Sequence, residues 1–416
     1  MVSYEPSADI SLPTGWEFKP LGECVVQKLS YGLNAPAIDY NSKYPAYIRI
    51  TDITGDGLYN AANRKSVMTQ ERERYTLHEG DIVLARTGAS TGKSYLYNKK
   101  DGELVYAGFL IRASIDCTVN NPYYIAGQFH MPRFWSWVAS VSMRSGQPGI
   151  NGKEYSSFHI PIAPKNEQDA IADSLKSLDT YILHLSELIE KKKAILEGAT
   201  EDLISGRTRI HGFAQKWTFV PIGQLLDFKN GLNKSKEFFG KGTPIINYTD
   251  VYHNKSLHAA DIKGKVSLTD SEIQRFRVQK NDVFFTRTSE TPDEVGLVSV
   301  LLDDIDDCVF SGFILRARPK TEKLFPGFCS YCFSSKEVRD QIVANCTYTT
   351  RALTNGRVLS AIEIPLPSLD EQIAITDSLN SMEDEISTLS SELRKIRQIR
   401  EGAMNDLLTG RIRLNM

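Results

Sequence analysis

The 416-residue sequence lacks any apolar run of 18 residues, so we expect no membrane-spanning helix. Its first residues, MVSYEPSADISLPTGW, contain no basic stretch followed by an apolar one, so no secretory signal is expected there. Cysteine is sparse and unevenly spread, as is usual for reduced thiols in the cytoplasm. The six cysteines are Cys24, Cys117, Cys308, Cys329, Cys332 and Cys346.

The sequence also lacks a recognisable catalytic or metal-binding constellation. Residues 87–94, TGASTGKS, approach a phosphate-binding loop, but a Thr replaces the first Gly and the following residues are typical of a strand. Residues 120–124, NNPYY, contain one Pro where a methyltransferase motif has two, and predict a helix start instead. The pair Cys329 and Cys332 has no second ligand pair, so buried thiols are expected and no metal or cofactor is.

Strong net charge is absent as well. Lys and Arg number 49 and Asp and Glu number 51, which gives a formal charge of −2. This balance argues against a surface that is basic throughout, but it leaves room for a local basic face.

What is present is an internal repeat. Residues 160–210 recur without a gap as residues 364–414. Both copies open on Ile-Pro, continue with Glu-Gln and close on Gly-Arg-x-Arg, so the chain is read as a duplication.

Each copy predicts a long helix of about 38 residues, or about 57 Å. Its apolar residues follow alternating steps of four and three, the period of a coiled-coil seam. These are Ile171, Leu175, Leu178, Ile182, Leu185 and Ile189, then Ile375, Leu379, Met382, Ile386, Leu389, Leu393 and Ile396. Asn166 and Asp370 are the expected N-caps, and Gly206 and Gly410 the expected stops. The seam needs a partner: we expect the other copy in the same chain, and the alternative is dimerisation.

Two α+β modules precede the helices. The frame W-x-F-x-P-hydrophobic-G occurs at Trp16 and again at Trp217. Short runs rich in β-branched and aromatic residues then match in pairs and predict strands. These pairs are 47–53 with 245–251, 80–87 with 280–288, and 107–112 with 311–316. Residues 122–140 and 325–344 predict helices in equivalent places.

Between the matched runs the modules diverge. Residues 54–79 share little with 254–279, and residues 88–106 share little with 289–309. Because frames carry packing and loops carry function, the two modules are expected to do one kind of task on different targets.

The whole chain from Trp16 onward resembles the specificity (S) subunit of type I restriction–modification systems. The W-x-F-x-P-hydrophobic-G frame, the segments IPIAPKNEQ and IPLPSLDEQ, and the segments EGATEDLISGR and EGAMNDLLTGR carry this resemblance. It implies target recognition domains at 1–159 and 213–363, and helical spacers at 160–212 and 364–416 that pair as an antiparallel coiled coil. Each domain would read one half of an asymmetric bipartite site in double-stranded DNA.

The resemblance further implies a non-catalytic subunit. Its partners would be two methyltransferase subunits, which would hold S-adenosylmethionine, and the restriction/translocase subunits. The docking candidates are the repeated residues of the helices: Glu167, Gln168, Gly198, Arg207, Glu371, Gln372, Gly402 and Arg411. The recurring Gly198 and Gly402 suggest the close approach of another backbone. An adaptor that binds proteins through a coiled coil, without DNA, is the alternative.

Base and phosphate contacts require Arg, Lys, Asn, Gln and hydroxyl side chains on loops. In the first module the candidates are Arg86, Thr87, Ser90, Thr91 and Lys93, then Arg144, Ser145, Gln147, Asn151 and Lys153. In the second they are Lys234 and Lys236, then Arg287, Thr288, Ser289 and Thr291, then Tyr348, Thr350, Arg351, Asn355 and Arg357. Arg86 and Arg287 recur, so either a phosphate contact or a brace for the frame is open to them.

Overall fold

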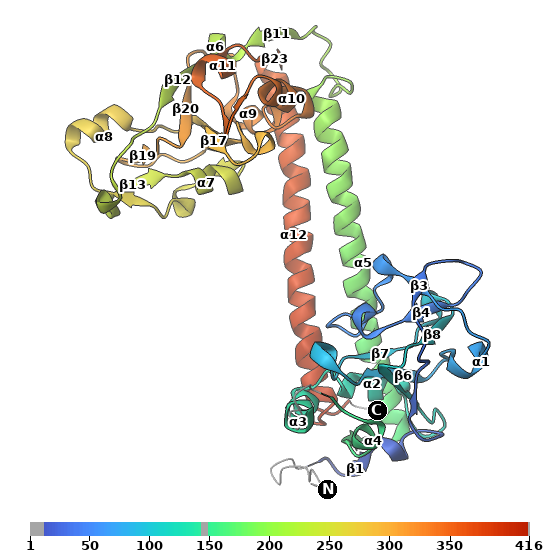
Figure 1. The fold of residues 1–416 in the computed structure, drawn as a ribbon. Helices are drawn as coiled ribbons and strands as arrows, with labels where there is room; N and C mark the ends of the chain where they lie inside the picture. The colour runs from blue at the N-terminus through green and yellow to red at the C-terminus, as the bar shows by residue number, and fades with distance from the viewer. Residues whose placement is uncertain (1–11, 143–148, 415–416) are drawn as a thin grey trace. The chain divides into compact units, whose positions relative to one another are not determined.

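The structure, a computed structural model, describes residues 12–142 and 149–414 (Figure 1). The chain divides into two compact units, one made of residues 1–186 and 391–416 and the other of residues 187–390. Each unit therefore contains one α+β module and a part of each long helix.

The long helices are α5 (Lys165–Ile204, 40 residues) and α12 (Leu369–Leu407, 39 residues). In the first unit, Arg400 Nε lies 2.9 Å from Asp179 Oδ1, and the Tyr181 hydroxyl donates to Glu392. In the second unit, Lys192 Nζ lies 2.7 Å from Glu385 Oε2. As the residue numbers of the contacting residues rise along α5, those of their partners fall along α12. The two copies therefore pair antiparallel within one chain, as predicted.

The seam positions of both helices are buried or half-buried, which confirms the 3.5-residue pattern. The predicted N-caps are wrong, because α5 begins one residue before Asn166 and α12 begins one residue before Asp370. Gln168 N donates to Pro164 O over 2.9 Å, which closes the first turn earlier than the side-chain pattern indicated. The stop glycines are confirmed: Gly206 and Gly410 have φ of +73° and +72°, a conformation that favours glycine.

The first module contains two four-stranded sheets. One has the order β2 (Ser30–Tyr31), β9 (Leu110–Ser114), β6 (Asp81–Ala85), β7 (Ser94–Leu96). The other has the order β3 (Ile38–Asp39), β5 (Lys65–Ser66), β4 (Ala46–Ile48), β8 (Leu104–Tyr106). The helices are α1 (Arg72–Tyr75), α2 (Pro122–Gln128), α3 (Pro132–Ser142) and α4 (Gly152–Ser156).

The second module has a five-stranded sheet in the order β12 (Leu226–Asn230), β20 (Ile314–Pro319), β16 (Val283–Thr286), β18 (Val298–Leu301), β14 (Ser256–Leu257). Two smaller sheets follow the orders β15 (Lys265–Val266), β13 (Phe239–Ile246), β19 (Val309–Phe310), and β17 (Thr288–Ser289), β22 (Ala352–Leu353), β21 (Thr347–Tyr348). Its helices are α6 (Ile222–Leu225), α7 (Tyr248–His253), α8 (Asp270–Phe276), α9 (Pro326–Cys332), α10 (Lys336–Ala344) and α11 (Gly356–Ser360).

The W-x-F-x-P frame forms a strand that joins the start of each module to its end. Strand β1 (Glu17–Pro20) pairs antiparallel with β10 (His159–Ile162), and β11 (Thr218–Pro221) pairs antiparallel with β23 (Glu363–Leu366). The register is the same in both modules, so the duplication extends to individual residue pairs.

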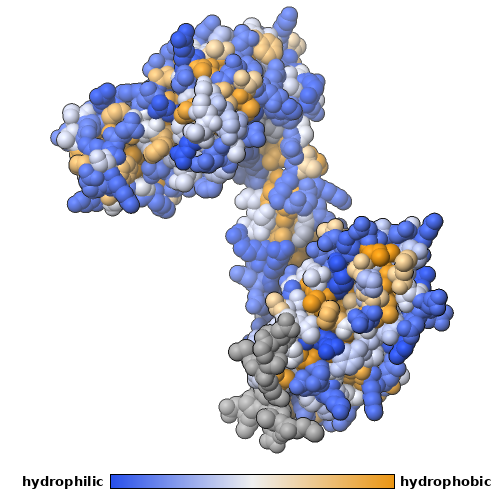
Figure 2. Space-filling view, in the orientation of Figure 1, coloured by the Kyte–Doolittle hydropathy of each residue, from blue (hydrophilic) through white to orange (hydrophobic). Residues whose placement is uncertain are grey.

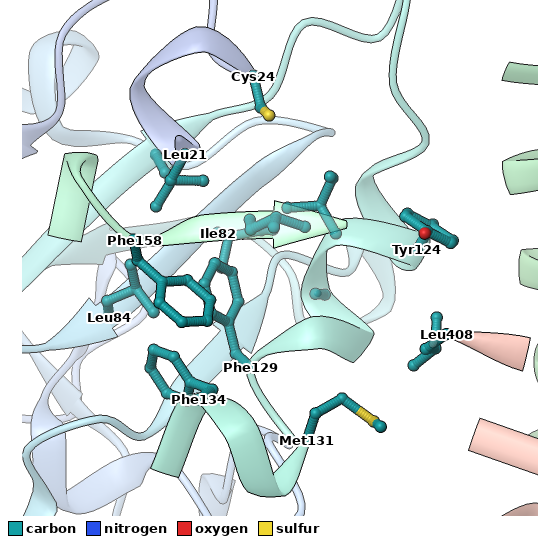
Figure 3. Packing of buried hydrophobic residues seen from close by; sticks show 14 of the residues in the cluster. Leu21, Cys24, Ile82, Leu84, Tyr124, Phe129, Met131, Phe134, Phe158 and Leu408 are labelled. Carbon is teal, nitrogen blue, oxygen red and sulfur yellow. The ribbon is translucent and has the colours of Figure 1, made fainter. Parts of the chain in front are cut away.

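The core of each module is completed by the end of the other module's helix. In the first unit Met404, Leu407 and Leu408 join the cluster that contains Phe129 and Phe134. Figure 3 shows Leu408 on the side of this cluster that carries Tyr124 and Met131. In the second unit Leu203 and Ile204 of α5 join the equivalent cluster. Burial of a Leu or Ile side chain contributes roughly 1.5–3 kcal/mol, so these helix ends belong to the cores rather than lying against them.

A buried carboxylate fixes each of these junctions. Glu167 accepts from Trp16 Nε1 over 3.0 Å and from Arg413 over 2.9 Å and 2.7 Å. Glu371 accepts from Trp217 Nε1 over 2.9 Å and from Arg209 over 2.6 Å and 2.7 Å. We call these two triads the helix clamps. Each clamp connects the start of a module, the start of one helix and the segment after the other helix.

Glu167→Gln is expected to destabilise the first unit by roughly 1–3 kcal/mol at pH 7, because it removes charge-assisted hydrogen bonds at a buried position. The Arg413 hydrogen bonds and then the Trp16 hydrogen bond hold the pKa of Glu167 below its usual range. A carboxyl with a lowered folded-state pKa stabilises above its unfolded pKa, about 4.3, and that stability is lost as the pH falls through the folded pKa.

Urea unfolding of the wild type and Glu167→Gln between pH 3 and 7 measures this difference, which is expected to shrink below about pH 4. Glu73, exposed on helix α1 of the same unit, provides the matched Glu73→Gln control. An equal loss in both variants would contradict a special role for the clamp.

Candidate nucleic-acid interface

In the first module, the two predicted DNA-contacting loops lie side by side. Ile150 N donates to Arg86 O over 2.9 Å, and Thr87 forms an isolated antiparallel bridge with Gly149. The segment that follows strand β6 is thus joined by backbone hydrogen bonds to the segment that precedes helix α4.

The second module repeats this arrangement and extends it. Thr354 N donates to Arg287 O over 3.0 Å. Beyond Arg287, strand β17 pairs with β22, and β22 pairs with β21, so both predicted loops form one small antiparallel sheet. This sheet was not predicted, because two-residue strands are too short to give a recognisable alternation.

The repeated arginines differ in what surrounds their side chains. Arg86 stacks on the Tyr31 ring, with its Cζ 4.8 Å from the ring centroid, and its buried Nε has no hydrogen-bond partner among the described residues. Arg287 Nη1 donates to Gly312 O over 3.4 Å. Each arginine is therefore braced against its own frame, yet no carboxylate of the described chain pairs with either one, which suits a contact with phosphate.

A groove of about 470 Å³ in the second module gathers Arg287, Asn355 and Arg357 with two lysines that sequence analysis missed, Lys229 and Lys320. Burial lowers the pKa of Lys229, and the positive charges of Arg316, Arg275 and Arg318 lower it further. Lys229 Nζ donates to Arg275 O and Lys320 Nζ donates to Gly223 O over 2.6 Å, and Asp227 also lines the groove. The cations still outnumber this carboxylate, so the groove attracts a polyanion. The sequence offered little indication of Lys229, because this lysine lies in a strand and does not recur. It lies opposite Arg316, and the equivalent residue of the first module, opposite Arg112, is Ser30.

Most of the remaining candidates are accessible. Thr87, Ser90, Lys153, Lys236, Thr288, Thr291, Tyr348, Thr350 and Arg351 are exposed or half-buried. Arg351 lies 3.0 Å from Glu290 in an exposed ion pair, which water screens and which a phosphate could replace. Arg144, Ser145 and Gln147 lie outside the described residues.

Two predicted DNA contacts are corrected by the structure. Thr91 is buried and its hydroxyl donates to Gly88 O over 2.8 Å. Ser289 is buried and its hydroxyl donates to Glu294. These hydroxyls stabilise the turns of their own loops, because a buried hydroxyl must find a partner within the protein.

Two predicted lysines already have partners in the chain. Lys93 Nζ donates to Ile53 O over 3.2 Å. Lys234 Nζ lies 2.5 Å from Glu272 Oε1 and over the Phe238 ring. The hydrogen bond from Lys234 is the largest of the contributions that lower the pKa of Glu272 to about 2. Both are weaker candidates than the arginines.

Asn151 and Asn355 are helix N-caps. The Asn151 side chain accepts from the amides of Lys153 and Glu154, and the Asn355 side chain accepts from those of Arg357 and Val358. Only their amide NH₂ groups are left to contact a ligand. The caps also aim the exposed Lys153 and Arg357 from the first turns of their helices.

Half of the docking candidates predicted on the helices are not on the surface. Glu167, Gln168, Glu371 and Gln372 are fully buried, so they cannot meet a partner. Gln168 bonds to Asn121 N and Ala163 O, and Gln372 bonds to Phe325 N, Lys323 O and Pro367 O. The repeated Glu-Gln pair therefore tethers each helix to its module, and it is an internal constraint rather than the docking surface that its repetition predicts.

The four other docking candidates remain accessible. A Cβ built at Gly198 or Gly402 would meet no atom within 4 Å, so the expected close backbone approach is absent from the described chain. Arg207 pairs with Asp202, and Arg411 pairs with Asp406, on exposed surface.

The near-motifs have structural explanations. Residues 94–96 form strand β7, so no helix follows the loop at 87–94 as phosphate binding would require. Pro122 begins helix α2 and Asn121 caps it. Cys329 and Cys332 are buried free thiols, and burial raises the pKa of both. In the described part of the chain, no group of His, Cys, Asp or Glu could hold a metal ion, and no helix could span a membrane.

The fold is a duplicated α+β module carried on two paired helices, with a polar loop site in each copy. The family model of the type I restriction modification DNA specificity domain matches residues 13–197 and again 214–398. The chain belongs to this family and is a specificity subunit of the type I restriction–modification class.

Relatives match over most of their length. The MjaVIII specificity subunit of Methanocaldococcus jannaschii is 23% identical, covering 97% of this chain and 95% of its own. The EcoKI specificity subunit of Escherichia coli is 24% identical, covering 88% and 81%. Among solved structures, the match to the S subunit from M. genitalium covers 100% of this chain and 99% of that one, at 14% identity and a TM-score of 0.56. The match to the HsdS subunit from Thermoanaerobacter tengcongensis covers 97% and 99%, at 16% identity and a TM-score of 0.51.

Asn355 allows capping and ligand contact to be separated. Asn355→Asp keeps a good N-cap, so the free energy of unfolding is expected to stay within about 0.5 kcal/mol of the wild type. Asn355→Ala loses the cap and is expected to cost about 1 kcal/mol. Asn355→Asp should nevertheless weaken DNA binding because it adds a negative charge beside Arg287 and Arg357. Urea unfolding and DNA titration of both variants test this, and unweakened binding by Asn355→Asp would remove Asn355 from the interface.

Proposed function

We propose that this chain is the DNA-recognition subunit of a type I restriction–modification complex, in which each module reads one half of a bipartite site. The observation that carries the proposal is the repeated site. Both modules bring together a segment after a buried strand and a segment before a capped helix. Both place at this junction an arginine that pairs with no carboxylate in residues 12–142 and 149–414.

The two halves of the DNA site are expected to differ. Tyr31 of the first module and Asn230 of the second occupy equivalent positions. The Tyr31 hydroxyl accepts from Gly152 N over 3.0 Å, whereas Asn230 lines the cationic groove. The second module has the small sheet of β17, β22 and β21 beside its arginine. Because different side chains meet the bases in each module, an asymmetric site fits better than a palindrome.

The helices would dock two methyltransferase subunits and set the spacer between the half-sites. The support is the exposed apolar surface of α5, where Tyr181, Leu183, Leu188 and Ile195 are 40–60% exposed. Figure 2 shows that apolar residues are scattered among hydrophilic ones on the visible face of the molecule. The methyltransferase subunits would hold S-adenosylmethionine and perform the chemistry, the restriction/translocase subunits would join them, and the complex would act in the cytoplasm where the DNA lies.

Arg351→Ala is expected to weaken reading of one half-site only. A base contact would cost roughly 1–3 kcal/mol, and a phosphate contact would instead lower the salt dependence of binding by about one ion. The measurement is competitive DNA binding by the complex with methyltransferase, using duplexes altered in one half at a time. Lys280→Ala, an exposed lysine of the same module outside both loops, is the control. Equal loss of discrimination at both halves would refute the modular reading.

Inserting seven residues, two helical turns, into both α5 and α12 should widen the spacer of the DNA site by about 3 base pairs. Seven residues add about 10.5 Å of helix, and each base pair occupies about 3.4 Å. Keeping whole turns preserves the seam and the face on which each module sits. Sequencing of methylated sites in cells carrying the lengthened subunit measures the spacer, and an unchanged spacer would disprove the ruler role of the helices.

A further inference from the structure

Each module displays one phenylalanine on its surface at the same place in the repeat. Phe109 is 59% exposed and Phe313 is 61% exposed. Both follow a glycine in the matched runs at 107–112 and 311–316. A single exposed apolar side chain needs no explanation by itself, but two at the same place in both copies, each bonded through its backbone to a candidate DNA-contacting arginine, point to a binding role.

The first of these rings is held on a rigid turn. Ala107 N donates to Ile48 O over 3.0 Å, and Gly108 N donates to Leu33 O over 2.7 Å. Leu110 N then donates back to Ala107 O over 2.8 Å, which closes a tight turn with Phe109 at its tip. The ring is therefore presented by a fixed backbone rather than by a long free loop.

The second turn has the same three hydrogen bonds. Ser311 N donates to Ile246 O over 2.9 Å, Gly312 N donates to Leu232 O over 2.7 Å, and Ile314 N donates to Ser311 O over 3.1 Å. A Cβ added at Gly312 would lie 3.0 Å from Leu232 O, so glycine permits this close approach. The fold thus builds the same support for a ring twice.

Both rings are positioned beside the candidate DNA-contacting residues. Arg86 N donates to Phe109 O, and Arg287 N donates to Phe313 O, each over 3.0 Å. Phe313 also lines a groove of about 330 Å³ together with Thr288 and Arg351. A ligand held by the arginines would therefore meet the rings as well.

We propose that Phe109 and Phe313 are apolar wedges, each inserted into the DNA duplex at one base step of its own half-site. The inference rests on the proposed function and adds a positioning role to it. Phenylalanine inserted between base pairs exchanges water for the apolar faces of the bases and locally unstacks the duplex. Positive charge next to the ring holds the phosphates while the step opens, so the Arg–Phe backbone pairing supplies both requirements.

The wedge gives each module a way to respond to DNA deformability. Steps that unstack at low cost, such as TA or CA, would accept the ring more readily than stiff steps. Discrimination would then extend to a base step whose edges no side chain contacts. Two wedges on separate modules would act independently, one for each half-site.

The test uses the complex with methyltransferase and a duplex of its methylated target sequence, identified first by sequencing methylated DNA. The adenine analogue 2-aminopurine, placed in turn along each half-site, reports unstacking through its fluorescence. The wild type should raise the fluorescence several-fold at one step in each half. Phe109→Ala should abolish the rise in one half, and Phe313→Ala should abolish it in the other.

Phe219, which is 58% exposed on strand β11 of the second module, provides the matched Phe219→Ala control and should change neither signal. Phe313→Leu retains an apolar side chain and should keep part of the rise. Thermal unfolding curves should be unchanged, because the substituted rings are exposed.

The outcomes separate the wedge from the proposed function. Fluorescence rises that persist in both Ala variants come from the methyltransferase and overturn the wedge, as does tight specific binding by the wild type with no rise outside the methylated base. Loss in both halves from a single Ala substitution also overturns it. A complex that binds its methylated sequence no better than random duplex overturns the proposed function itself, and the wedge with it.

Discussion

The buried carboxylate at the start of each long helix is the constraint on which the rest of the structure depends. Glu167 and Glu371 each accept hydrogen bonds from a tryptophan at the start of a module and from an arginine beyond the end of the opposite helix. A buried charge is tolerated only when it is paired and fully hydrogen-bonded. Each clamp therefore specifies at once where the module begins, where one helix starts and where the other helix finishes.

This constraint makes each recognition module and its helical support a single folded unit. The segment Met404–Leu408 completes the core of the first unit, and Leu203 and Ile204 complete that of the second. A module that borrows core residues from the other copy's helix cannot move freely on a linker. Such stiffness is what a reader of DNA needs if its loops are to meet the bases in a fixed register with its helices.

Much of the candidate site could be predicted from residue type and repetition. Arg86 and Arg287 were recognisable because they follow the same buried strand in both copies, and the structure joins each to the second predicted loop. Thr91 and Ser289 could not be judged in that way, because a hydroxyl used by its own turn has the same sequence signature as one that meets a ligand. Lys229 was missed because its importance comes from neighbours far away in the chain, Arg287 and Arg357.

The strands predicted at 47–53 and 245–251 end early, because a 3₁₀ turn at Ile50–Asp52 and helix α7 at Tyr248–His253 replace their second halves. The sequence by itself determined the duplication, the paired long helices with their stop glycines, and several of the strands and helices in each module. It could do so because heptad spacing, β-branched runs and glycine positions act locally. Only the tertiary structure decided that the repeated Glu-Gln pair is internal, that Gly198 and Gly402 face open space, and that Phe109 and Phe313 stand exposed on rigid turns. Burial and exposure are properties of the assembled chain. A residue that recurs in both copies can be buried or exposed, so its recurrence does not tell the two apart.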